Sequence, residues 1–114
     1  MSARVVALVG DLMDRSRLDA LGEIAWASSA ETAADLATDT GADTVVVDIA
    51  RYGSQIRALR ELAPALYIVA FGSHVDATAL ADARSAGADR VLPRSRFFAD
   101  PAAALAPGGG SARA

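Results

Sequence analysis

The chain has 114 residues, a hydrophobic fraction of 53% and a formal net charge of −3 at pH 7. It contains no cysteine, and all eleven of its lysine-or-arginine positions are arginine, which excludes disulfides, thiolate metal sites, Schiff-base catalysis and a P-loop lysine. The length predicts a single domain, and the acidic balance argues against general nucleic-acid binding through phosphate neutralisation.

No apolar run approaches the roughly 20 residues that a membrane-spanning helix requires. The run near the N-terminus, Val5–Val9, meets Asp11 too early to serve as a signal peptide. We therefore expect a cytoplasmic protein without a membrane partner. Residues 1–106 are expected to form the domain, and the glycine-rich residues 107–114 are expected to be a flexible tail.

Five short apolar runs alternate with segments of helical periodicity, which is the pattern of repeated strand–helix units. The runs expected to be strands are residues 5–9, 24–27, 44–47, 66–71 and 90–92. Helices are expected at residues 11–21, 28–40, 56–63 and 76–86, and after Asp100-Pro101. Short connections between such units predict an α/β, flavodoxin-like three-layer sandwich, with a five-stranded parallel sheet of order 2-1-3-4-5.

Polar residues mark the helix starts. Asp11 is a natural N-cap for the first helix. Ser28 and Glu31 have the spacing of a capping box for the second helix, and Ser73 stands at the same spacing before Asp76. These spacings predict where the helices begin.

One phrase occurs twice along the chain. Residues 37–48 read ATDTGADTVVVD and residues 83–94 read ARSAGADRVLPR. In each copy a glycine ends a helix, a strand follows, and the strand is closed by a charged residue, Asp48 or Arg94. Because ligand chemistry gathers beyond the carboxyl ends of parallel strands, Asp11, Asp48 and Arg94 are expected at one edge of the sheet, with the two acids at the switch point.

These features resemble the receiver domain of response regulators, over roughly residues 4 to 105. The resemblance implies that Asp48 stands where that family accepts a phosphoryl group, and that Asp11 is one of two acids that hold Mg²⁺ after strand 1. It also implies that strand 4 should end in a hydroxyl and strand 5 in a lysine. Gly72, Ser73 and Arg94 fall at or beside those two positions.

The sequence also departs from the family's pattern. Gly10 replaces the first acid, Gly72 the hydroxyl and Arg94 the lysine, and the segment 49–63 is several residues shorter than usual. Asp11 and Asp48 would therefore bind Mg²⁺ weakly, if at all, and no other cofactor is implied. An arginine can pair bidentately with a carboxylate, so we expect Arg94 to neutralise Asp48 and to lower its pKa. This is the pattern of a degenerate member, a pseudo-receiver.

Several residues have a structural interpretation beside the functional one. Asp48 is either a phosphoacceptor or a strand-end acid bound to Arg94 or to a backbone amide. Asp11 is an N-cap, a metal ligand or both. Ser73 is the start of a capping box or a hydroxyl that contacts a phosphoryl group. His74 is the only histidine, and a metal site there has no second ligand.

Arginines gather near the same edge. Arg15 and Arg17 lie in the first helix, and Arg94 and Arg96 follow the fifth strand. These four guanidinium groups could face one region that meets an anion or an acidic partner, although salt pairs on a solvated helix explain Arg15 and Arg17 equally well.

Three functions follow. The first is a stand-alone degenerate receiver that acts by protein–protein contact in bacterial two-component signalling, without phosphotransfer. The second is a phosphorylatable single-domain response regulator that uses Asp48 and Mg²⁺. The third is a sensor of a small anionic ligand at the crevice between strands 1 and 3. An enzyme is not expected, because no nucleophile–base pair is visible. The protein partner is unknown, and a second copy of the chain is also a candidate.

Overall fold

A computed structural model describes residues 3–106, so the tail expected at 107–114 lies outside the described residues. All five strands form one parallel sheet of order β2-β1-β3-β4-β5, as the sequence predicts. The strands are β1 (Val5–Leu8), β2 (Ile24–Trp26), β3 (Thr44–Asp48), β4 (Tyr67–Gly72) and β5 (Arg90–Pro93). The helical elements are α1 (Leu12–Asp19), α2 (Ala30–Thr40), α3 (Ile49–Tyr52), η1 (Gly53–Gln55), α4 (Ile56–Leu62), α5 (Ala77–Ala86), α6 (Arg94–Ala99) and α7 (Pro101–Leu105).

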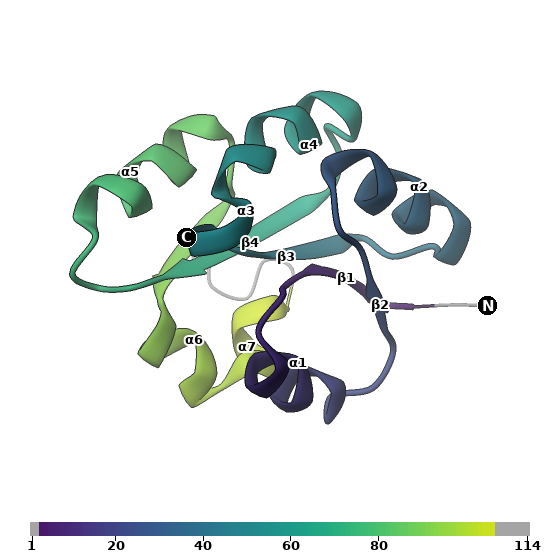
Figure 1. Ribbon diagram of the computed structural model, residues 1–114. Coiled ribbons are helices and arrows are strands. Elements are labelled where there is room, and N and C mark those ends of the chain that lie inside the picture. Colours follow the sequence, from purple (N-terminus) through teal and green to yellow (C-terminus); the bar gives the residue numbers. More distant parts are fainter. Residues whose placement is uncertain (1–2, 107–114) are drawn as a thin grey trace.

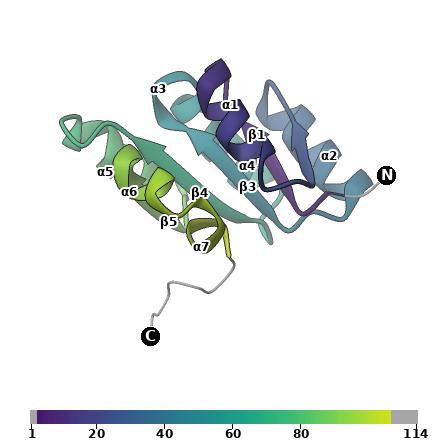
Figure 2. The ribbon, with the colours of Figure 1, turned by 90° about the horizontal axis from the view of Figure 1, so that it is seen from below.

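Helices cover both faces of the sheet. Figure 1 shows α2, α3, α4 and α5 on one side and α1, α6 and α7 on the other, and Figure 2 shows the second layer from below. This is the predicted three-layer arrangement. Within residues 3–106, no helix is both long enough and apolar enough to cross a membrane.

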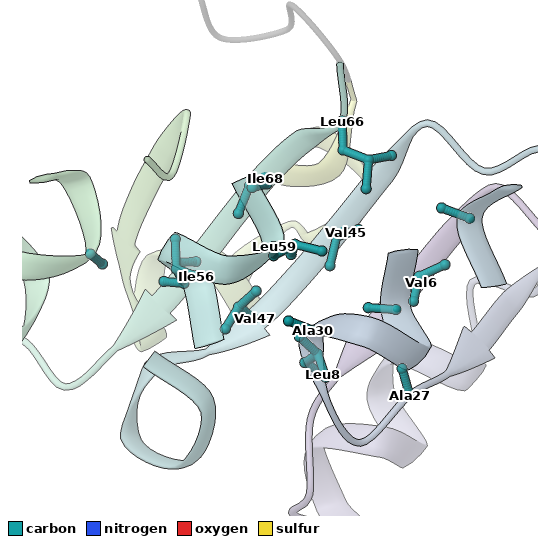
Figure 3. Packing of buried hydrophobic residues seen from close by; sticks show 14 of the residues in the cluster. Val6, Leu8, Ala27, Ala30, Val45, Val47, Ile56, Leu59, Leu66 and Ile68 are labelled. Atoms are coloured by element: carbon teal, nitrogen blue, oxygen red, sulfur yellow. The ribbon is translucent and has the colours of Figure 1, made fainter. Parts of the chain in front are cut away.

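The two cores follow from the alternation of side chains along β3. Val45 and Val47 face the layer that contains α2 and α4, and Val46 faces the layer that contains α1 and α6. All three valines are fully buried. Figure 3 shows Ile56 and Leu59 of α4 packed over the first of these faces. A strand buried on both faces needs a continuous apolar run, which explains the valine triplet.

The second helix starts one residue later than predicted. Its N-cap is Ser29, whose Oγ accepts the N–H of Thr32 at 3.1 Å, while Thr32 Oγ1 accepts the N–H of Ser29 at 3.0 Å. The expected box of Ser28 and Glu31 is therefore wrong. Starting the helix at Ala30 places that alanine, 1% exposed, against the sheet.

The repeated phrase ends a helix in the same way in both copies. Gly41 and Gly87 have φ of +82° and +120°, values that L side chains rarely adopt. In the second copy, Asp89 accepts the N–H of Ile68 at 2.8 Å and also binds Arg60. The Arg60 guanidinium further donates to the carbonyls of Pro64, Leu66 and Gly87. This clamp joins the end of α4 to the starts of β4 and β5.

Candidate functional site

The site is built on the carboxyl edge of β1 and β3. Leu8 and Val47 are register partners, so Asp11 and Asp48 follow neighbouring strands at the switch point. The Asp11 carboxylate is close enough for its charge to raise the pKa of Asp48. Asp11 is the N-cap of α1, and its Oδ1 accepts the N–H groups of Met13 and Asp14 at 2.9 and 3.0 Å.

Asp48 closes β3 and at the same time caps the next helix. Its Oδ1 accepts the N–H of Ala50 at 3.2 Å, and the residue is 8% exposed. Of the two structural interpretations from the sequence, the bond to a backbone amide is the one that forms. The acid at the strand end is therefore held by the first turn of α3.

The pKa of Asp48 is raised, which contradicts the expected decrease. Burial is the largest cause, and the negative charges of Asp14 and Asp11 raise this pKa further. The hydrogen bond from Ala50 and the positive charge of Arg94 both lower it, but they do not outweigh burial.

Arg94 binds Asp14 and not Asp48, so the expected pair is wrong. The Arg94 guanidinium donates a hydrogen bond to Asp14 Oδ1 and forms a salt bridge with it. The physical reason is that α6 begins at Arg94 itself, which carries the side chain toward α1. There the guanidinium carbon lies 5.6 and 5.2 Å from the ring centroids of Phe71 and Phe98. The hydrogen bond to Asp14 raises the pKa of Arg94.

Asp14 is the site residue that the sequence analysis missed. It is 1% exposed, and its Oδ2 has no hydrogen-bond partner among the described residues. It shares the buried face of α1 with Leu18, four positions later. A charged residue at the i−4 position from a core leucine was the signal available in the sequence.

Two side chains of α3 fill the places left by the glycines. A Cβ on Gly10 would lie 2.8 Å from Arg51 Cδ, and a Cβ on Gly72 would lie 3.3 Å from Ile49 Cβ. Because α3 starts directly after Asp48, its first turn carries both side chains to the edge of the sheet. Arg51 thus lies against Gly10, where the resemblance places the first acid of the pair, in the crevice where a small-anion site was expected.

These residues offer few free oxygen ligands for Mg²⁺. A Mg²⁺ site needs several oxygen ligands in octahedral geometry. Here Asp11 and Asp48 each use an oxygen as a helix cap, and a guanidinium lies beside Gly10. Across residues 3–106 there is no group of three His, Cys, Asp or Glu side chains that could hold a metal ion.

Ser73 does not start a capping box. The N-cap of α5 is Asp76, which accepts the N–H of Ala79 at 3.0 Å, and Ser73 Oγ accepts the N–H of Val75 at 3.3 Å. The polar side chains of this loop thus form local hydrogen bonds. Ser73 and His74 are both exposed and line a pocket beside α6.

The four arginines do not share one face. Arg15 donates to the carbonyl of Val9 at 2.8 Å and covers Trp26, which packs at the edge of the core. Arg17 and Arg94 converge on Phe98, each with its guanidinium carbon 5.2 Å from the ring centroid. Arg96 does not line the pocket that these two share.

No protein-family model and no curated protein matches the sequence. Solved structures do match the fold. A CheY-like protein (tadZ) from Pseudomonas aeruginosa is 21% identical with a TM-score of 0.73, covering 88% of this chain and 93% of that chain. A response regulator from Burkholderia pseudomallei was solved with a phosphorylated aspartic acid, a calcium ion and citrate. It is 19% identical with a TM-score of 0.70, and the match covers 99% of this chain and 71% of that chain. The signal receiver domain of an HD domain-containing protein from Pseudomonas fluorescens is 15% identical with a TM-score of 0.72, covering 91% of each chain. The chain therefore has the CheY-like receiver fold.

Proposed function

We propose that this chain is a receiver-like signalling domain that acts by contact with a protein partner and is not switched by phosphotransfer. The observation that carries the proposal is the use of the site's charged groups inside the domain itself. Arg94 is bound to the buried Asp14, and Asp48 caps α3.

Phosphoryl transfer to a carboxylate depends on positioned positive charge around the transferring group. In this chain the strand-end cation is already bound to a carboxylate, and Gly10 removes one of the two acids that would hold a metal ion. The Arg51 side chain lies where that acid would extend. Each change lowers the stabilisation of the transition state, so we expect little or no phosphorylation and at best weak binding of Mg²⁺.

Exposed apolar side chains at the same edge support a role in protein contact. Leu12 and Met13, directly after Asp11, are 80% and 70% exposed, and Val75 in the β4–α5 loop is 78% exposed. Two adjacent exposed apolar residues at the first turn of a helix offer a hydrophobic anchor beside the charged site.

The second candidate function is that of a phosphorylatable regulator. It is favoured by the position of Asp48 at the end of β3 in a fold shared with a protein that was solved with a phosphorylated aspartic acid. The hydrogen bond from Ala50 uses only Oδ1 of Asp48, so the second carboxylate oxygen would be the one to accept the phosphoryl group.

Intact-mass spectrometry after incubation with acetyl phosphate and millimolar Mg²⁺ separates the two functions. We expect no gain of mass, with the unmodified receiver domain of a phosphorylatable regulator as positive control. A stoichiometric gain of one phosphoryl group that is absent in Asp48→Asn would establish the second function and refute the first.

A further inference from the structure

We propose that the pocket between α1, the β4–α5 loop and α6 binds a phosphate monoester. The pocket has a volume of about 390 Å³ and is lined by Arg17, Ser73, His74, Arg94, Ser95 and Phe98. Its volume falls in the lower part of the range of small-molecule sites. The proposal concerns a site beside Asp48 and does not depend on whether Asp48 accepts a phosphoryl group.

The two guanidinium groups of this pocket keep N–H donors that no carboxylate of the described residues occupies. No carboxylate is among the lining residues. Asp14 binds only the NH2 group of Arg94, and no described residue forms a salt bridge with Arg17. Two guanidinium groups thus face one space; Asp14 contacts Arg94 through one nitrogen, and Asp48 and Asp11 act on Arg94 only through their charge. An oxyanion placed there gains Coulomb energy from both.

The aromatic ring fixes the two cations in place. Both guanidinium groups lie 5.2 Å from the centroid of Phe98, one from α1 and one from α6. Phe98 is itself held by edge contacts with Phe71 and Phe97, at centroid distances of 5.1 and 4.8 Å. Donors that are already positioned lose little freedom when a ligand binds.

The donor set matches a phosphate better than a carboxylate. A phosphate monoester carries three terminal oxygens, and arginine binds such oxygens bidentately. Two arginines, the hydroxyls of Ser73 and Ser95 and the imidazole of His74 offer more donors than the two oxygens of a carboxylate can use. The remaining volume beside Phe98 accommodates a small organic group, which favours a monoester over free phosphate.

The test is a titration of the ¹⁵N-labelled chain, followed by amide chemical shifts at constant ionic strength. The probes are phenyl phosphate and inorganic phosphate, and phenol serves as the control for contact with the ring alone. We expect saturable shifts at Ser73, Ser95 and Phe98, and tighter binding of phenyl phosphate than of inorganic phosphate. Equal affinities would assign the site to inorganic phosphate and overturn the monoester.

Two variants make the result specific. Arg17→Gln should lower the affinity for phenyl phosphate at least tenfold, because Arg17 lines the pocket. The Arg94–Asp14 salt bridge does not involve Arg17 and should remain. Arg96→Gln is the matched control, since it removes the same charge from an exposed residue of α6 outside the lining, and it should leave the affinity unchanged. Shifts that do not saturate, or equal losses in both variants, would overturn the proposal. The phosphorylation experiment measures the mass of the whole chain, with Asp48→Asn to assign the site, and it stays interpretable in either case.

Discussion

Arg94 and Asp14, 80 positions apart, join the first residue of α6 to the buried face of α1. The carboxylate is almost fully enclosed, and its second oxygen has no partner among the described residues. A buried carboxylate without its counter-ion is costly, so this salt bridge stabilises the contact between α6 and α1.

The first prediction concerns this pair. Arg94→Ala leaves Asp14 as an isolated buried charge and should lower the free energy of unfolding by about 3 kcal/mol, near the low end for such pairs because the arginine side chain is 43% exposed. Urea denaturation at pH 7 measures the change. Adding Asp14→Asn should restore part of the loss, and Arg96→Ala is the control, with an expected change within about 0.5 kcal/mol.

Double-mutant cycles distinguish Asp14 from Asp48 as the partner of Arg94. We expect a large coupling energy between Arg94 and Asp14. The coupling energy between Arg94 and Asp48 should be small, since their charges interact without a hydrogen bond or salt bridge. Additive effects for the first pair would show that the salt bridge does not contribute to stability.

The second prediction concerns pH. The pKa of Asp48 in the folded chain is raised above its usual value of 3.8. Between these two pKa values the folded chain binds more protons than the unfolded chain, so this residue lowers stability as the pH rises through that window. Asp48→Asn keeps an oxygen that can accept the N–H of Ala50 and removes the buried charge. It should therefore stabilise the chain at pH 7.

Thermal or urea unfolding of Asp48→Asn and of the natural sequence between pH 3 and pH 7 checks this. The gain from the substitution should shrink as the pH falls toward 3.8. Asp82→Asn, at an exposed position of α5, is the control and should show no such trend. A variant that is less stable than the natural sequence at pH 7 would mean that the charge of Asp48 is favourable.

The third prediction concerns the missing acid. Gly10→Asp adds a carboxylate beside Asp11, but its Cβ would meet Arg51 Cδ at 2.8 Å. Because Arg51 is long and exposed, it can move, although its charge still competes with a cation. Gly10→Asp combined with Arg51→Ala should therefore bind Mg²⁺ at least tenfold more tightly than the natural sequence, as measured by calorimetry.

The matched control is Gly10→Asp combined with Arg57→Ala, which removes a positive charge at an exposed position of α4. It should gain less affinity than the Arg51 combination. If both combinations bind Mg²⁺ equally, or neither binds better than the natural sequence, the Arg51 side chain is not what limits the site.

The fourth prediction compares the two copies of the repeated phrase. Gly41→Ala places a Cβ in open space and should cost about 1–2 kcal/mol, from the positive φ alone. Gly87→Ala also requires a positive φ, here +120° against +82° at Gly41, and its Cβ would lie 2.9 Å from Arg60 Cγ. Displacing Arg60 disturbs its bonds to the carbonyl of Gly87 and to Asp89, so the loss should be clearly larger. Equal losses in urea denaturation would show that the clamp is adaptable.

The sheet could be predicted from the sequence because every strand except β2 is a short apolar run that ends at or directly before a glycine or a charged residue, as at Gly10 and Asp48. The position of Asp48 at the edge follows from the same pattern. The partner of Arg94 could not be predicted, because it depends on α6, a helix that begins at Arg94 with no side-chain cap. Arg51 was missed for a related reason, since α3 is only four residues long.

The strands at the two ends of the sheet have a consequence for self-association. β2 has three residues and β5 has four, and β5 ends in Pro93, which has no N–H to offer to another strand. Arg90 in β5 also extends to the carbonyls of Ala103 and Ala104 in α7. The described sheet therefore offers no long open edge that could be extended by a strand from another molecule.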